Sequence, residues 1–224
     1  ILSGLVGSEM CIRDRARRAA LKFCFRVTAA LPLLRGAAVG RLSWGPMPEP
    51  SAAQLTAADL RPTGDGSLTL YSHRYRQTYG SAHGAQAQAR HVFVGGTGIA
   101  ASAAGRVLEI GFGVGQNLRA TLAAREGQRL DYLAYEVDPV PVSVLAELAP
   151  AAAASPLWQA LLAAWPPAEG EELRAEAGPQ ALRVVRGNVL HMNLPRDWAD
   201  AVYLDGFSPD DNPEPVSYTH LTLP

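Results

Sequence analysis

Residues 107–117 read Val-Leu-Glu-Ile-Gly-Phe-Gly-Val-Gly-Gln-Asn, a mostly apolar segment that leads directly into a turn with three alternate glycines. The apolar start is typical of a buried parallel strand. Gly111, Gly113 and Gly115 permit a tight turn and let a ligand approach the backbone closely. A helix over residues 116–125 would point its N-terminal amides at that ligand. The stretch therefore predicts a site for a nucleoside cofactor.

Two acidic residues narrow the choice of cofactor. Glu136 lies near the end of the next apolar segment, where a carboxylate suits hydrogen bonding to ribose hydroxyls. That spacing also fits a nicotinamide dinucleotide enzyme. Glu109, two residues before the first glycine, makes the segment resemble motif I of S-adenosylmethionine-dependent methyltransferases. An ordinary strand–helix turn with a solvent-facing Glu109 is the alternative that involves no ligand.

A second group of residues follows the apolar segment 199–204, which reads on as Asp205-Gly206-Phe207-Ser208-Pro209 and then Asn212-Pro213. The carboxyl end of a parallel strand is where open α/β sheets bind ligands. The segment is similar to the Asp/Asn-Pro-Pro-aromatic motif of methyltransferases that act on nitrogen. Asp, Gly, Ser and Pro are equally ordinary residues of a turn, so a purely structural role stays open.

Together these segments resemble the methyltransferase domain of the MnmC family and its stand-alone MnmD relatives, over roughly residues 62–213. The upstream residues Tyr79-Gly80-Ser81 and Arg90-His91-Val92-Phe93-Val94 are also similar to that family. The resemblance implies methylation of the aminomethyl group on the wobble uridine of tRNA, with S-adenosyl-L-methionine as cofactor. The chain departs from the family pattern at Gln88, at Asp211, and after Pro213, where the family's Trp is absent.

The resemblance also implies roles for individual residues. Asp205 would orient the amine and accept its proton, and Phe207, Ser208 and Pro209 would lie at the acceptor. The cofactor would be held by Glu109, Gly111, Phe112, Gly113, Gly115, Asn117, Glu136 and Asn188.

The order of patterned segments predicts an α/β fold, a Rossmann-like class I methyltransferase sheet with a short antiparallel β preface. The preface is expected at residues 68–79 and 91–94. Parallel strands are expected at 106–111, 130–137, 181–186 and 199–204, helices at 116–125, 139–149 and 155–165, and a loop at 166–178. Ser155 is placed to cap the third helix, whose aromatic residues are expected to pack in the core. Seven strands are usual in this fold, so we expect a C-terminally truncated domain.

Both ends of the chain resemble translated sequencing-adapter read-through. We therefore expect residues 1–46 to be an artefactual or disordered leader, 47–100 an N-terminal β extension, 101–215 the truncated methyltransferase domain, and 216–224 an artefactual tail. A genuine basic leader and a genuine tail are the alternative. Both cysteines, Cys11 and Cys24, fall in the leader. The rest of the chain has no cysteine, which excludes an intrachain disulfide framework and cysteine-based catalysis there.

Charge argues against indiscriminate nucleic-acid binding, because residues 47–224 carry 12 Lys and Arg against 19 Asp and Glu, a net charge of −7. The exception is residues 61–91, where four arginines and three histidines accompany the single acid Asp65. This region is either a phosphate-contacting patch or a solvated hairpin. No metal-ligand spacing and no membrane span or export signal is evident, so a cytoplasmic location is expected.

Three functional hypotheses remain. The first is the tRNA methyltransferase, present as a fragment, with an FAD-dependent oxidase domain possible in the native gene. The second is a methyltransferase for another acceptor, because motif I specifies the cofactor better than the substrate. The third is a non-catalytic nucleotide-binding remnant.

Overall fold

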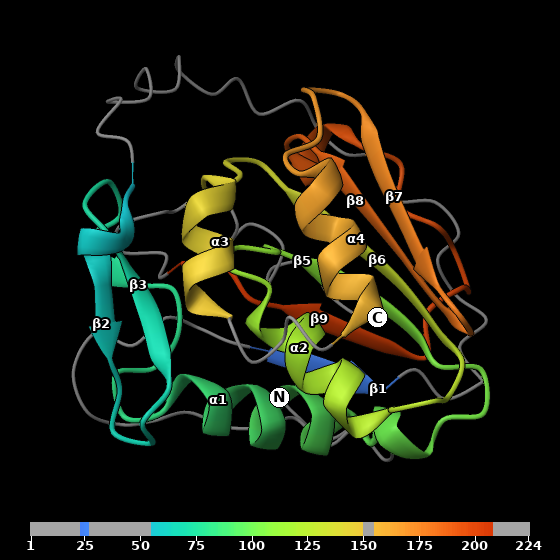
Figure 1. The fold of residues 1–224 in the computed structure, drawn as a ribbon. Coiled ribbons are helices and arrows are strands. Elements are labelled where there is room, and N and C mark those ends of the chain that lie inside the picture. Colours follow the sequence, from blue (N-terminus) through green and yellow to red (C-terminus); the bar gives the residue numbers. More distant parts are fainter. Residues whose placement is uncertain (1–22, 27–54, 150–154, 208–224) are drawn as a thin grey trace, which may run out of the picture.

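The computed structural model describes residues 23–26, 55–149 and 155–207. Their centre is a six-stranded sheet with the order β1-β9-β5-β6-β8-β7 (Figure 1). Its four parallel strands are β5 (Arg106–Ile110), β6 (Leu130–Glu136), β8 (Gln180–Arg186) and β9 (Ala201–Leu204). The predicted α/β class and the four predicted parallel strands are therefore confirmed.

The register of the three central strands brings their carboxyl ends to one edge. Ile110 of β5 pairs with Tyr135 of β6 on one side and with Leu204 of β9 on the other. The residues that follow these three therefore emerge side by side. The glycine turn after β5, Glu136 and Asp205 therefore lie at the same edge of the sheet.

Antiparallel strands flank the parallel ones on both sides. β7 (Glu172–Ala177) pairs with β8, and β1 (Phe23–Arg26) pairs with β9. The predicted loop over 166–178 is thus wrong in its second half. Leu173 and Ala175 are buried while Arg174 and Glu176 are exposed, a period-two alternation that the abundant Glu and Gly of this segment conceal.

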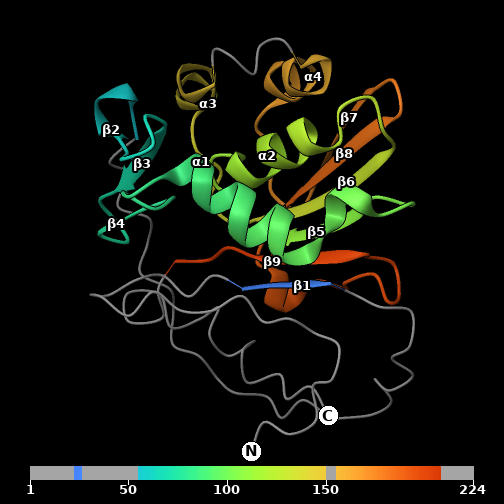
Figure 2. The same ribbon diagram turned by 90° about the horizontal axis from the view of Figure 1, so that it is seen from below.

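The helices α1 to α4 lie together on one side of the sheet (Figure 2). The predicted helices are present as α2 (Gln116–Ala124), α3 (Val142–Leu148) and α4 (Pro156–Ala164). Ser155 precedes Pro156 as predicted, but its side chain makes no capping hydrogen bond. None of the helices in the described residues combines the length and apolar character needed to cross a bilayer.

The strand predicted at residues 91–94 is wrong. These residues belong to the π-helix η2 (Ala89–Gly95), which continues α1 (Ala85–Gln88) and precedes the short turn η3 (Ile99–Ala101). Ala85, Ala89 and Phe93 are buried at four-residue spacing, which is helical. The run Val92-Phe93-Val94 alone is typical of a strand, but the buried residues at four-residue spacing over the longer segment favour a helix.

The N-terminal preface is a separate three-stranded antiparallel sheet of β2 (Leu60–Pro62), β3 (Leu68–Ser72) and β4 (Gln77–Thr78), introduced by the turn η1 (Ala57–Asp59). The segment predicted as one strand over 68–79 is a β3–β4 hairpin. Asp65 accepts hydrogen bonds from Thr63, Ser67 and the amide of Ala87, which ties this sheet to α1. These donors hold the pKa of Asp65 well below its usual range.

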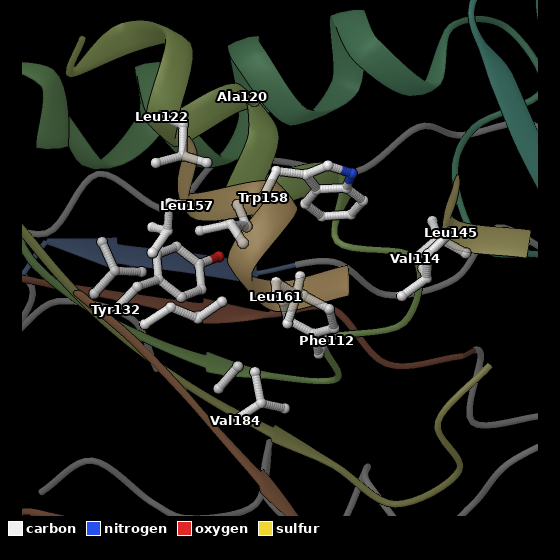
Figure 3. Packing of buried hydrophobic residues seen from close by; sticks show 14 of the residues in the cluster. Phe112, Val114, Ala120, Leu122, Tyr132, Leu145, Leu157, Trp158, Leu161 and Val184 are labelled. Carbon is white, nitrogen blue, oxygen red and sulfur yellow. The ribbon is translucent and has the colours of Figure 1, made fainter. Parts of the chain in front are cut away.

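The main core lies between the helices and the sheet. Trp158 and Leu161 of α4 are fully buried and pack beside Phe112 of the glycine turn (Figure 3). A Cβ on Gly115 would come within 2.7 Å of the Trp158 ring. The aromatic residues of α4 therefore pack in the core, as predicted, and support the turn from beneath.

Arg125 fixes the opposite end of this core. Its side chain is almost fully buried, and its guanidinium donates to the backbone oxygens of Ile99, Ser102 and Arg129 at 2.6, 2.9 and 2.7 Å. The backbone of η3 and the start of β6 are thereby joined through one side chain. Because the shell around the cation consists of carbonyl dipoles, removal of the cation would leave buried acceptors unsatisfied.

We expect Arg125→Met to lower the free energy of unfolding by about 2–4 kcal/mol, since the aliphatic volume stays but the buried carbonyls lose their donor. Urea unfolding followed by circular dichroism measures this change. Arg129→Met is the matched control, because the Arg129 side chain is exposed. Equal stability of the two variants would contradict the clamp role of Arg125.

Candidate active site

The glycine turn after β5 holds three glycines in left-handed backbone conformations. Their φ angles are +87° for Gly111, +54° for Gly113 and +67° for Gly115. A Cβ on Gly111 would lie 2.5 Å from the backbone oxygen of Asp205, and one on Gly113 would lie 2.9 Å from the Tyr79 ring. Both the conformation and the close contacts therefore require glycine at these positions.

Below this turn, one amide joins two acids from neighbouring strands. The Nδ2 of Asn117 donates to Glu109 Oε1 at 2.8 Å and to Asp205 Oδ2 at 2.7 Å. The Tyr132 hydroxyl donates to the other oxygen of Glu109 at 2.8 Å. The structure thus brings Glu109, Asn117 and Asp205 together, as the sequence predicts, but with Asn117 as the bridge between the acids.

Glu109 is completely buried. Burial, and next the negative charge of Asp205, raise the pKa of Glu109 well above its usual value, while the bonds from Asn117 and Tyr132 act in the opposite direction. Because Glu109 has no exposed surface and both of its oxygens accept from side chains inside the protein, this geometry favours a role in holding Asn117 over direct contact with a ligand. Tyr132 has no place in the sequence prediction, because its hydroxyl reaches Glu109 only through the pairing of β5 with β6.

Glu136 closes the other side of the turn. Its Oε2 accepts from the amide of Gly113 at 2.7 Å, and its Oε1 accepts from the amide of Asp138 at 2.8 Å. The residue is buried, and burial raises its pKa although the two amides oppose that change. The predicted acid at the end of the second strand therefore lies against the backbone of the glycine turn.

Aromatic residues cover the end of β9. Phe207 stacks on Tyr75 with ring centroids 4.3 Å apart and meets Tyr79 edge-on at 4.8 Å. Tyr79 in turn lies against Gly113. Burial, and next the charge of Glu136, raise the pKa of the Tyr79 hydroxyl well above its usual value. Tyr79 belongs to the segment that resembles the family, but the sequence predicts no role for it. Tyr75 was not predicted as a site residue, because only the folded hairpin brings it to Phe207.

Comparison with known proteins agrees with this arrangement. A family model described as S-adenosyl-L-methionine-dependent methyltransferase matches residues 152–221, which include Asp205 and Phe207. The protein named tRNA 5-methylaminomethyl-2-thiouridine biosynthesis bifunctional protein MnmC of Ralstonia nicotianae is 38% identical over 74% of this chain and 26% of its own length. The protein of the same name from Cupriavidus metallidurans is 40% identical over 67% of this chain and 25% of its own length.

The chain belongs to the MnmC methyltransferase-domain family. It spans about a quarter of the length of these relatives. The crystal structure of MNMC2 from Aquifex aeolicus shares the fold, with a TM-score of 0.50 and 25% identity over 70% of this chain and 51% of that one. The Rossmann-like methyltransferase fold is thereby shown.

The cofactor of this family is S-adenosyl-L-methionine, and the residues present fit it. Gly115 is the N-cap residue of helix α2 and has no side chain that could cap it. The first α-helical hydrogen bond runs from the amide of Arg119 to the carbonyl oxygen of Gly115. The amides of residues 116–118 precede that ladder and suit a carboxylate such as that of a methionine group. Glu136 provides acceptors for hydroxyl groups at the same edge.

The remaining predicted residues have different outcomes. The Asn188 side chain caps the turn η5 (Val189–His191) by accepting from the Leu190 amide, while Gly187 N donates to Glu136 O. The turn therefore lies beside the end of β6, and the predicted adenine contact of Asn188 stays a prediction. Ser208 and Pro209 lie outside the described residues.

Departures from the family pattern have limited structural effect where the structure describes them. The side-chain oxygen Oε1 of Gln88 accepts a hydrogen bond from the backbone amide of Ser81 at 2.9 Å, so a neutral side chain makes this contact. Asp211 and the segment after Pro213 lie outside the described residues. Among the described residues, no group of three or more His, Cys, Asp or Glu side chains could hold a metal ion.

Three of the basic residues in the region 61–91 have partners within the protein. Arg61 donates to the backbone oxygens of Ala58 and Leu60, and His73 pairs with Asp59 at 2.8 Å. Arg74 forms an ion pair with Asp138 at 3.1 Å. Several of the cations therefore serve contacts within the protein.

We expect Glu109→Gln to remove a pH dependence of stability. Because its folded-state pKa is raised, Glu109 binds its proton more tightly in the folded protein. Its contribution to stability is full below the ordinary value of 4.5 and is lost as pH rises through the folded-state pKa. Urea unfolding at pH 5 and pH 8 should show wild type losing more stability than the variant. Glu147→Gln, on the exposed side of α3, is the control and should follow wild type.

We expect Gly111→Ala to abolish binding of S-adenosylhomocysteine in calorimetric titration, because its Cβ would push against the end of β9. Gly127→Ala separates this effect from backbone strain. Gly127 also has a positive φ, +68°, but nothing lies within 4 Å of its Cβ. The control should lose about 1–2 kcal/mol of stability and keep normal binding. Equal binding by both variants would contradict the contact argument.

Proposed function

We propose that this chain is an S-adenosyl-L-methionine-dependent N-methyltransferase that acts on the aminomethyl group of the wobble uridine of tRNA, in the cytoplasm. The observation that carries the proposal is the hydrogen bond from Asn117 to Asp205. Through this bond, the first turn of α2, which contacts the cofactor in this proposal, holds Asp205 at the end of β9, where the acceptor binds. The relatives are named as tRNA 5-methylaminomethyl-2-thiouridine biosynthesis proteins, which supports this acceptor.

In this proposal the residues of the sheet edge divide the work of binding the cofactor. The backbone of the glycine turn and the first amides of α2 hold the methionine part. Glu136 accepts from the ribose hydroxyls, exchanging its present bond to the Gly113 amide or adding to it, and Asn188 lies at the adenine. Phe112 supports the turn from the core. Glu109 acts through Asn117.

The bound cofactor supplies a methyl group that its sulfonium already activates. The protein therefore needs chiefly to align two reacting atoms and to manage one proton. Asp205 accepts a hydrogen bond from the amine, which orients the nitrogen lone pair, and takes up the proton that the nitrogen loses, directly or through water. Asn117 fixes one oxygen of that carboxylate, and the Tyr75–Phe207 stack limits water at the strand end.

The acceptor wall in this proposal consists of Phe207 with Ser208 and Pro209. Phe207 is already stacked on Tyr75, so the two rings form the wall together. The relatives are named bifunctional proteins. A partner FAD-dependent oxidase domain in the native protein stays a prediction.

The proposal is tested with tRNA that carries 5-aminomethyl-uridine. Incubation with the chain and S-adenosyl-L-methionine should yield the methylaminomethyl nucleoside, detected by mass spectrometry of the digested tRNA. Cofactor binding without any change of this nucleoside would contradict the acceptor. Absence of heat with S-adenosylhomocysteine would contradict the cofactor site itself.

We expect Asp205→Asn to bind S-adenosylhomocysteine with wild-type affinity and to lose turnover by about 100-fold or more, because the amide keeps the bond to Asn117 but cannot accept a proton. Single-turnover methylation measures the loss. The same chemical change at Asp131, which pairs with Arg183 at the opposite end of the sheet, is the control. Near-normal rates in Asp205→Asn would remove Asp205 from the mechanism.

A further inference from the structure

The tip of the β3–β4 hairpin, residues 73–76, is anchored to the candidate active site. Tyr75 stacks on Phe207, two residues beyond Asp205. Arg74 pairs with Asp138, two residues beyond Glu136. The tip is therefore held at both strand ends that carry the site's acids, on the acceptor side.

Arg76 is the arginine of the hairpin tip that these contacts do not use. The Arg74 guanidinium is used by Asp138 and also lies over the Tyr75 ring, 5.1 Å from its centroid, and His73 is used by Asp59. Arg76 is exposed, and no described residue forms a hydrogen bond or ion pair with its guanidinium. Its charge is thus available to a ligand beside the aromatic wall.

The backbone at Arg76 is also unusual. Its φ angle is +52°, in the left-handed region, which a glycine would adopt without strain. A side chain at such a position costs stability, and the described structure shows no internal bond of the guanidinium that offsets the cost. Left-handed residues are regular members of hairpin turns, so the inference rests on the exposed guanidinium of the residue that follows Tyr75.

We propose that Arg76 binds a backbone phosphate of the acceptor RNA next to the methylated nucleotide, an inference that rests on the proposed function. The full chain carries 20 Lys and Arg against 21 Asp and Glu, a net charge of −1, so its net charge provides no general attraction for RNA. Attraction must come from local cations. A guanidinium, which can donate two parallel hydrogen bonds, suits a phosphate, and its place at the tip aligns the strand with Asp205.

Binding of a fluorescent anticodon stem–loop RNA to the full chain, followed by anisotropy over a range of salt concentrations, tests this inference. Arg76→Gly and Arg76→Gln remove the charge, with and without relief of the strained backbone. Both should weaken binding about tenfold at low salt and reduce the slope of log K against log salt by about one. Arg76→Lys should keep the slope. Arg129→Ala, an exposed cation just before β6 at the opposite edge of the sheet, should behave like wild type.

Two further measurements separate the outcomes. Arg76→Gly should melt at the wild-type temperature or above it and should bind S-adenosylhomocysteine normally, so loss of RNA binding is not loss of the fold. If wild type methylates the RNA and both charge-removing variants keep its affinity and salt slope, the role of Arg76 is overturned while the proposed function stands. If wild type neither binds nor methylates the RNA, both are overturned.

Discussion

The arrangement of this protein depends on one buried amide that serves two acids. Glu109 is buried near the end of β5, and Asp205 directly follows the neighbouring strand β9. Two carboxyl groups so close together are unfavourable unless donors meet them. Asn117 provides one N–H to each, and Tyr132 provides a further donor to Glu109. The start of α2 is thereby bonded to both strands, and the glycine turn that precedes it is held in place. The geometry of this sheet edge therefore depends on the hydrogen bonds that the two carboxyl groups require.

Much of the fold could be predicted because its signals are local. The four parallel strands and the helices between them show clear apolar periodicity, and Pro156 marks the start of α4. Helix η2 and strand β7 were missed for opposite reasons. In η2 the short Val-Phe-Val run predicts a strand, whereas the longer stripe of buried residues at helical spacing determines the structure. In β7 the small and charged residues conceal the alternation of buried and exposed side chains.

The site could be predicted less completely. Glu109, Glu136 and Asp205 stand at strand ends, and position along a strand is visible in sequence. What each side chain bonds to is not, because partners come from the pairing of strands and from the N-terminal sheet. The cofactor contact predicted for Asn117 stays a prediction, and the bonds from its two N–H groups to Glu109 and Asp205 were not foreseen. The basic region 61–91 was treated as a unit, although its cations contact different parts of the molecule.

The contact between Tyr79 and Gly113 has a wider consequence. The ring takes up the room that the absent Cβ leaves, so the nucleotide-side turn and the hairpin that faces the acceptor form one mechanical unit. A ligand that displaces either partner changes the other. Cofactor and nucleic acid would then influence each other's affinity to an equal degree, as thermodynamic reciprocity requires. The missing Cβ at Gly113 thus serves the packing of Tyr79 as well as the left-handed backbone of the turn.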